Sequence, residues 1–371
     1  MRFEFFLTAF FRDGAPDALT TETAPAQEQS ERSGVVRVAG ALGRGVLAVA
    51  PWLFIAGLLW AAIFVRPQPL GSTVQPPLIE ERDAFFGATL PTADVAWMVG
   101  SDGKILRSED GLATWTRQDA ATQEHLQHVA AWSEDRAVAV GNDGVALYTQ
   151  DGGASWHLGD APRSEIANKL LRVRTVGEAE AWAVGEMGAL LHTQDGGASW
   201  ARAMPEKDLA WADISFNGTG VSMLVGEFGE MRRSIDGGQT WETLTPKVES
   251  SLTSVAFAEE GQGVAVGLEG VILTTTDHGE TWAQVNSPTE FHLFDVVWDA
   301  DSQRWLAVGD QGTWVVGQID GEWESGRISQ NSMPWLMDVQ PVDGGALMVG
   351  AQVGVWEGPA GAWRQFTSNG E

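Results

Sequence analysis

Residues 137–156 read AVAVGNDGVALYTQDGGASW, and this pattern occurs seven times between Phe85 and Trp363. Each copy has an apolar strand ending in Gly, a short turn closed by a second Gly, another strand, and a turn ending in Trp. The first glycines are Gly100, Gly141, Gly185, Gly226, Gly267, Gly309 and Gly350. A period near forty residues with about four strands per unit is typical of a β-propeller, with one blade for each repeat. The sequence therefore predicts an all-β, seven-bladed propeller.

The last turn of the repeat carries an aspartate five residues before the closing tryptophan, as in TQDGGASW (149–156). This turn is the Asp-box, or BNR repeat, of sialidases and related propellers. Its carboxylate can accept N–H groups of its own turn, and its Trp can pack between blades. Equivalent turns of a ring lie too far apart to converge on one substrate. We therefore assign a structural role to Asp110, Asp151, Asp195, Asp236 and Asp277, and to Trp115, Trp156, Trp200, Trp241 and Trp282.

The composition argues against disulfides, metal sites and nucleotide-binding motifs. The 371 residues contain no Cys, which excludes disulfides, thiolate metal sites and a cysteine nucleophile. The six histidines are scattered without metal-ligand spacing, and neither a P-loop nor a dinucleotide fingerprint is present. We expect no metal and no cofactor.

The charge is distributed unevenly along the chain. Residues 1–66 hold six Arg and six acidic residues, so the net charge of −27 falls entirely on residues 67–371. Such a surface repels nucleic acid and attracts cationic partners. The alternative is that the charge only keeps the domain soluble.

An uncharged apolar stretch occupies residues 45–65, between Arg44 and Arg66. Its 21 residues could cross a bilayer, and Arg residues concentrate on its N-terminal side, which favours a cytoplasmic N-terminus. We predict a cytoplasmic tail (1–43), a transmembrane helix (44–66), a Pro-rich spacer (67–82) and a propeller (83–371). In a Gram-negative cell this places the propeller in the periplasm, anchored to the inner membrane. The sequence does not assign a role to the Phe-rich N-terminal segment. The ring could close in two ways: residues 363–366 could complete the last blade, or residues 76–82 could add a strand to it.

The turn between the second and third strands carries an acidic residue in six of the seven repeats. A propeller places these turns on one face, where they would form an acidic ring that binds a basic partner. The alternative is that Asp is simply a good turn former. The ring would consist of Asp102, Asp143, Glu186, Glu227, Glu269 and Asp310.

One stretch of the acidic domain is basic, near an insertion between the second and third repeats. It could be a docking patch or an ordinary solvated loop. The residues are Arg163, Lys169, Arg172 and Arg174.

The strand pairs AWMVGSDG (96–103), AWAVGEMG (181–188) and WLAVGDQG (305–312), followed by Asp-box turns, resemble the photosystem II stability/assembly factor family over residues 83–363. The resemblance implies a propeller that binds a membrane-protein precursor without catalysis. Some non-photosynthetic relatives are encoded near RND-type exporters. Two features depart from the family pattern, because its photosynthetic members carry an arginine-rich patch and this chain adds an apolar anchor.

A sialidase would need a tyrosine nucleophile and three converging arginines, and the one tyrosine, Tyr148, directly precedes an Asp-box. The sequence therefore predicts a non-enzymatic periplasmic scaffold or assembly factor for an inner-membrane complex, for which an RND-type exporter subunit is a candidate partner. The alternative is an envelope propeller that binds or hydrolyses glycans.

Overall fold

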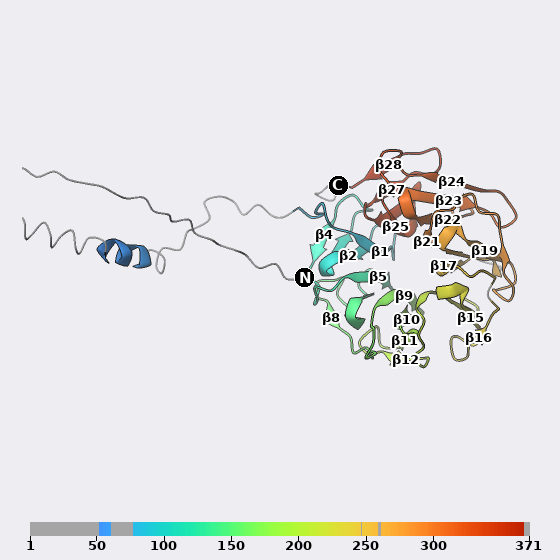
Figure 1. Cartoon of the computed structure of the whole chain (residues 1–371), viewed down its shortest axis with the longest axis horizontal. Helices are drawn as coiled ribbons and strands as arrows, with labels where there is room; N and C mark the ends of the chain where they lie inside the picture. Colours follow the sequence, from blue (N-terminus) through green and yellow to red (C-terminus); the bar gives the residue numbers. More distant parts are fainter. Residues whose placement is uncertain (1–51, 61–76, 246, 259–260, 367–371) are drawn as a thin grey trace, which may run out of the picture. The chain divides into compact units, whose positions relative to one another are not determined.

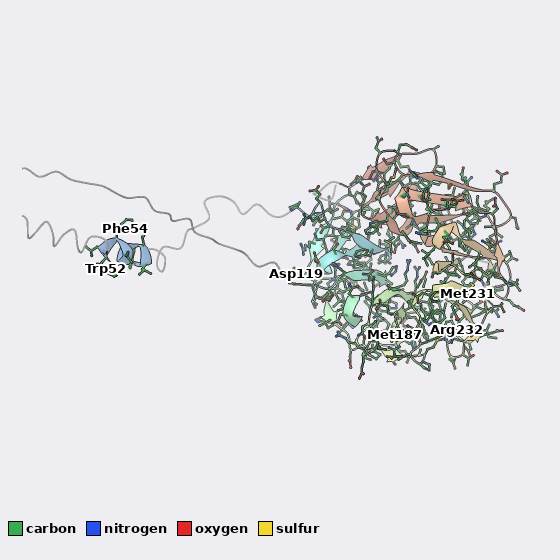
Figure 2. The ribbon with its side chains drawn as sticks, in the orientation of Figure 1. Trp52, Phe54, Asp119, Met187, Met231 and Arg232 are labelled. Atoms are coloured by element: carbon green, nitrogen blue, oxygen red, sulfur yellow. The ribbon has the colours of Figure 1, made fainter. Side chains whose placement is uncertain are left out.

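The computed structural model describes residues 52–60 and 77–366, except 246 and 259–260. The chain divides into two units, Met1–Val74 and Gln75–Glu371. In the first unit, residues 52–60 are helical and expose large apolar side chains such as Trp52 and Phe54 (Figure 2). Among the described residues, no helix combines the length and apolarity needed to span a membrane. The rest of the span expected at residues 45–65, the tail (1–43) and most of the spacer (67–82) lie outside the described residues.

The second unit is a ring of seven four-stranded antiparallel sheets (Figure 1). Each sheet is formed by four consecutive strands, with the first strand innermost, which confirms the seven-bladed propeller. The strands are β1 Phe85–Thr89, β2 Ala96–Gly100, β3 Ile105–Ser108, β4 Thr116–Gln118, β5 Leu126–Ala131, β6 Ala137–Gly141, β7 Ala146–Thr149, β8 His157–Leu158, β9 Leu170–Val176, β10 Glu180–Gly185, β11 Ala189–Thr193, β12 Ala201–Arg202, β13 Trp211–Phe216, β14 Ser222–Gly226, β15 Met231–Ser234, β16 Glu242–Thr243, β17 Leu252–Phe257, β18 Gly263–Gly267, β19 Ile272–Thr275, β20 Ala283–Gln284, β21 Leu293–Asp299, β22 Arg304–Gly309, β23 Thr313–Gly317, β24 Trp323–Arg327, β25 Leu336–Val342, β26 Gly345–Gly350, β27 Gly354–Trp356 and β28 Trp363–Gln365.

Short 3₁₀ turns join the second and third strands of five blades. They are η1 Ser101–Gly103, η2 Asn142–Gly144, η3 Glu227–Gly229, η5 Leu268–Gly270 and η6 Asp310–Gly312. The Asp-box turns join the third and fourth strands, so they lie at the opposite end of each blade. We call these two faces the turn face and the Asp-box face.

Close backbone contact explains why the second strand of every repeat ends in Gly. A Cβ on Gly141 would overlap the carbonyl oxygen of His125, just before the inner strand of the same blade. That carbonyl accepts the N–H of Asn142 at 2.9 Å. The other six first glycines face an equivalent carbonyl in the same way. The first glycines are therefore regularly spaced because each blade makes this backbone contact once.

The ring closes without a shared strand. Strand β28 pairs with β27, so the segment at residues 363–366 completes its own blade, and β1 begins the first sheet at Phe85. The first and last blades meet through one apolar cluster that includes Phe85, Leu112, Leu347 and Phe366.

Candidate functional site on the turn face and at the centre of the ring

Each Asp-box carboxylate is used within its own turn. Asp151 Oδ1 accepts the N–H of Ser155 and the hydroxyl of Thr149, both at 2.9 Å, and Oδ2 accepts the Ser155 hydroxyl at 2.6 Å. The same bonds recur at Asp110, Asp195, Asp236 and Asp277. Of the closing tryptophans, Trp115, Trp156, Trp200 and Trp282 are buried and Trp241 is half-buried.

These bonds make the Asp-box turns sensitive to acid. The Ser155 hydroxyl and N–H lower the pKa of Asp151 from 3.8 to about 2, and Thr240 does the same for Asp236. A carboxylate with a lowered folded pKa contributes stability that is present above pH 3.8 and is lost as the pH falls toward 2. We expect the urea midpoint, followed by circular dichroism, to fall between pH 4 and pH 2. The double variant Asp151→Asn, Asp236→Asn should show a smaller fall, and an unchanged pH dependence would contradict this origin.

The six acidic turn residues occupy two different positions. Glu186, Glu227 and Asp310 come directly after the first glycine of the repeat and are half-buried. Glu186 accepts the N–H of Lys169 at 2.9 Å, and Glu227 accepts the N–H of Ala210 at 2.8 Å. These two carboxylates hold the start of the inner strand in their own blade, and Asp310 accepts the N–H of Gln311.

Asp102, Asp143 and Glu269 come one residue later and are exposed, in left-handed conformations with φ of 53°, 51° and 59°. Three other non-glycine residues share this left-handed position: Met187 (Figure 2), Phe228 and Gln311. Phe228 is 70% exposed. The turn face therefore projects three carboxylates and a large aromatic side chain.

The basic stretch expected from the sequence does not form a surface patch. Arg172 and Arg174 belong to strand β9, and Arg172 is only 6% exposed, because β9 is the inner strand of its blade. Arg163 is exposed and pairs with Asp143 at 3.3 Å, and half-buried Lys169 directly precedes β9. The four residues follow one another in sequence across a boundary between a loop and a central strand, so they do not form one surface.

Arg172 instead belongs to a ring of residues at the centre of the propeller. Each blade contributes the third residue of its inner strand, beside a shift of register in the pairing with the second strand. We call this set the central ring. It consists of Gly87, His128, Arg172, Asp213, Ser254, Asp295 and Asp338, and the six that carry side chains are buried.

Ion pairs cross the middle of this ring. Arg172 Nη1 donates to Asp295 Oδ1 at 2.9 Å and lies 3.6 Å from Asp338 Oδ2. Arg174 Nη2 donates to Asp213 Oδ2 at 3.0 Å. The hydroxyl of Ser254 lies 2.9 Å from oxygens of both Asp213 and Asp295. Two guanidinium groups therefore hold three carboxylates.

The central ring also joins neighbouring blades. Asp213, Asp295 and Asp338 accept the N–H groups of Val255, Val339 and Ala88, each on the inner strand of the next blade. The bond from Ala88 to Asp338 bridges the first and last blades.

Burial and charge set the ionisation of the central ring. Burial raises the pKa of Asp295 and Asp338, while for Asp213 the arginines Arg174 and Arg172 outweigh burial and lower the pKa. Burial and then Arg172 hold the pKa of His128 well below 6.5, which favours the neutral imidazole. The sequence contains a pattern that could have indicated the central ring. A charged residue stands third in four otherwise apolar strand segments: LLRVRT, WADISF, LFDVVW and LMDVQP.

Among the described residues, no group of three or more His, Asp or Glu side chains is arranged to hold a metal ion. The acids of the central ring pair with arginine, and those of the Asp-boxes accept hydrogen bonds within their own turns. Asp102, Asp143 and Glu269 on the turn face belong to neither set and are exposed.

Comparison with known proteins agrees with this architecture. Residues 112–212 and 204–290 match the family model described as "Photosynthesis system II assembly factor YCF48". A search of curated proteins found no match.

Three solved structures illustrate the likeness of fold. A structure titled "YCF48 bound to D1 peptide" is 18% identical, with a TM-score of 0.60 over 72% of this chain and 91% of that one. YCF48 from Cyanidioschyzon merolae is 16% identical, with a TM-score of 0.60 over 73% and 94%. Virginiamycin B lyase from Staphylococcus aureus, an enzyme by name, is 12% identical, with a TM-score of 0.63 over 75% and 94%. At these identities the structures show the fold alone. Over residues 112–290 the chain is similar to the photosystem II assembly factor family of propellers.

Proposed function

We propose that the chain is a non-catalytic scaffold or assembly factor for an inner-membrane protein complex, with an RND-type exporter as the specific candidate. The propeller would stand in the periplasm, held by the apolar segment at residues 45–65. The family supports a role in protein interaction, since a similar propeller is titled as bound to a peptide.

The left-handed positions of the turn face carry this proposal. Asp102, Asp143, Phe228 and Glu269 adopt a conformation that costs about 1 kcal/mol or more per non-glycine residue. Glycine would remove that cost at each turn. Their side chains are exposed, and the acids contact side chains of neighbouring loops: Asp102 lies 3.7 Å from His125, Asp143 pairs with Arg163, and Glu269 accepts the hydroxyl of Ser250. Packing within the blade core therefore does not account for them. We infer that the turn face binds a partner through an aromatic anchor surrounded by carboxylates, and that the partner surface is basic.

Charge reversal tests the turn face. The triple variant Asp102→Lys, Asp143→Lys, Glu269→Lys should reduce capture of the membrane partner by about tenfold or more in pull-downs from detergent extracts, because like charges then face each other. The matched control reverses three exposed acids on the Asp-box face, Glu134→Lys, Glu178→Lys and Glu280→Lys, with the same change in net charge. Equal capture by both variants would contradict the proposal.

A further inference from the structure

Two of the three exposed acids on the turn face lie on turns that a histidine holds. The backbone N–H of Asp102 donates to Nδ1 of His125 at 2.9 Å, and the N–H of Glu269 donates to Nδ1 of His292 at 2.8 Å. Each histidine directly precedes the inner strand of the next blade, β5 and β21 respectively. The two bonds therefore fasten left-handed residues of the first and fifth blades to the second and sixth blades.

A third turn makes the same bond to an acceptor that does not titrate. The N–H of Phe228 donates to the hydroxyl oxygen of Ser251 at 3.3 Å, and Ser251 directly precedes β17 of the next blade. The residue before an inner strand thus accepts the N–H of the preceding blade's turn. Because serine can serve as this acceptor, the two histidines add a property that the bond itself does not need, which is the capacity to bind a proton.

These bonds depend on the protonation state of the imidazole. A ring nitrogen accepts a hydrogen bond only while it carries no proton, so the bond to Nδ1 requires the neutral ring with its proton on Nε2. Histidine is the side chain that changes charge between about pH 5 and 8. Proton uptake at Nδ1 sets two N–H donors against each other, so the charged ring cannot hold the turn.

The surroundings of His125 make its charge matter to the turn face. Asp102 Oδ1 lies 3.7 Å from Nδ1 of His125, and the Asp102 side chain is 82% exposed. Exposed Glu124 directly precedes the histidine, and the ring of Phe86 lies 6.2 Å away. A proton on His125 therefore places a positive charge beside the carboxylate that a basic partner would contact.

His292 has a similar setting in the sixth blade. Its ring is exposed and lies 6.5 Å from the ring of Phe294. Exposed Glu290 stands two residues earlier, and the guanidinium of Arg327 lies 5.0 Å from the centre of the phenylalanine ring that directly precedes His292. Glu269, whose N–H the histidine accepts, is exposed. Protonation of His292 thus adds a positive charge to a second part of the turn face.

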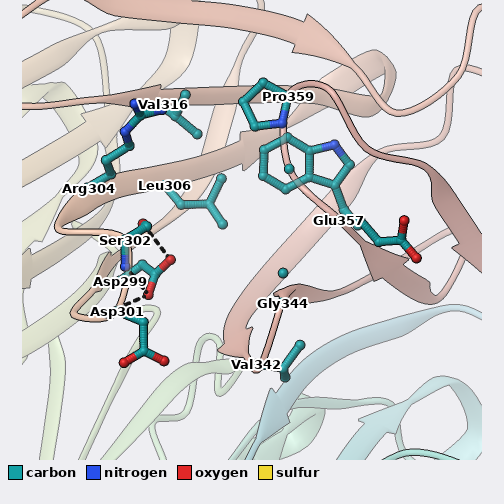
Figure 3. A pocket seen from close by; sticks show the side chains of 13 residues that line it. Asp299, Asp301, Ser302, Arg304, Leu306, Val316, Val342, Gly344, Glu357 and Pro359 are labelled. Atoms are coloured by element: carbon teal, nitrogen blue, oxygen red, sulfur yellow. Dashed lines mark hydrogen bonds between the residues drawn. The ribbon is translucent and has the colours of Figure 1, made fainter.

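The opposite face holds its turns with carboxylates. In the turn between β21 and β22, Asp299 accepts the N–H of Asp301 at 3.1 Å and the hydroxyl of Ser302 at 2.6 Å (Figure 3). Carboxylates change charge near about pH 4. Acid between about pH 7.5 and 5.5 therefore titrates the histidine bonds of the turn face and leaves turns of this kind intact. The other four histidines belong to the central ring, to a third or fourth strand, or to an Asp-box turn: His128, His192, His157 and His278.

We propose that the turn face is a docking surface gated by protons, in which neutral His125 and His292 hold the turns of Asp102 and Glu269 in position for a basic partner. Protonation releases both turns and adds two positive charges to the face, so the partner dissociates in mild acid. The inference rests on the proposed function, which assigns these carboxylates to the partner. Asp143, on a turn without a histidine, contributes the part of binding that does not change over this range.

Hydrogen exchange of the full-length chain in detergent tests the switch without any partner. Mass spectrometry of peptides that cover the three turns gives protection factors, corrected for intrinsic exchange, at about pH 7.5 and about pH 5.5. Protection at Asp102 and Glu269 should fall by about tenfold or more in acid, because each turn loses the bond that closes it. Protection at Phe228, which is bonded to Ser251, should stay the same. An equal change at the three turns, or no change at any of them, would overturn the proposal.

Replacing both histidines with serine supplies the matched variant, since Ser251 shows that serine accepts the same bond. The measured quantity is the ratio of membrane-partner capture at about pH 7.5 to capture at about pH 5.5. This ratio should be about tenfold or more for the unaltered chain and within about twofold for His125→Ser, His292→Ser. Equal ratios for the two chains would overturn the proposal. If neither chain captured a membrane protein at either pH, the proposed function would fail, and the exchange measurement would still decide the switch.

Discussion

Replacing Arg172 with methionine is expected to lower the free energy of unfolding by about 3–5 kcal/mol, because it leaves buried carboxylates without their counterion. Arg172 Nη1 donates to Asp295 and lies 3.6 Å from Asp338, and both carboxylates are almost fully buried. Their pKa values are already raised by burial, so the loss of a positive charge will raise them further. Urea unfolding followed by tryptophan fluorescence measures the change.

The matched control is Arg163→Met, which removes an arginine that is half exposed and pairs with Asp143 on the surface. Its effect should stay within about 0.5 kcal/mol. Adding Asp295→Asn to the Arg172→Met variant should recover part of the lost stability, since one unpaired charge is then removed. A loss below about 1 kcal/mol for Arg172→Met would show that the central ring does not hold the blades together.

Replacing Phe366 with alanine is expected to lower the free energy of unfolding by about 3–4 kcal/mol. Phe366 is 5% exposed, lies 5.9 Å from the ring of Trp115, and joins the cluster between the first and last blades. Because each sheet is made of four consecutive strands, side-chain packing and the bond from Ala88 to Asp338 must close the ring.

Phe228→Ala provides the control for Phe366→Ala, because it removes the same side chain from a position that is 70% exposed. It should change the unfolding free energy by less than about 0.5 kcal/mol. If the two variants unfolded at the same urea concentration, packing at this seam could not be what closes the ring.

The sequence predicts the fold well because each repeat carries its own backbone constraints. Gly141 meets the carbonyl of His125, and Asp151 binds its own turn, so the contacts that define a blade are local and recur with the period. The central ring needs a different comparison, in which the third residues of all inner strands are set side by side. Arg172 is then matched with Asp213, Asp295 and Asp338 rather than with its neighbour in sequence, Arg163.

The packing of the degenerate last repeat could not be predicted from the sequence alone. The changes at Trp356, Gly358 and Pro359 are visible as a degenerate repeat, but their consequence lies in the neighbouring blade. Only the structure shows that Trp356, which stands where other repeats have the Asp-box threonine, packs in one buried cluster with Leu306 and Val316 of the sixth blade. The two positions of the turn-face acids likewise differ in backbone conformation, which separates exposed Glu269 from half-buried Glu186.

Site-specific crosslinking in native membranes tests the central claim most directly. A photo-reactive phenylalanine analogue at Phe228 places the reagent on the turn face without adding charge. The account predicts that irradiation captures a membrane protein, identified by mass spectrometry, and that Asp102→Lys, Asp143→Lys, Glu269→Lys abolishes the product. Recovery of peptidoglycan or polysaccharide in place of a protein would contradict the account and favour a glycan-binding propeller.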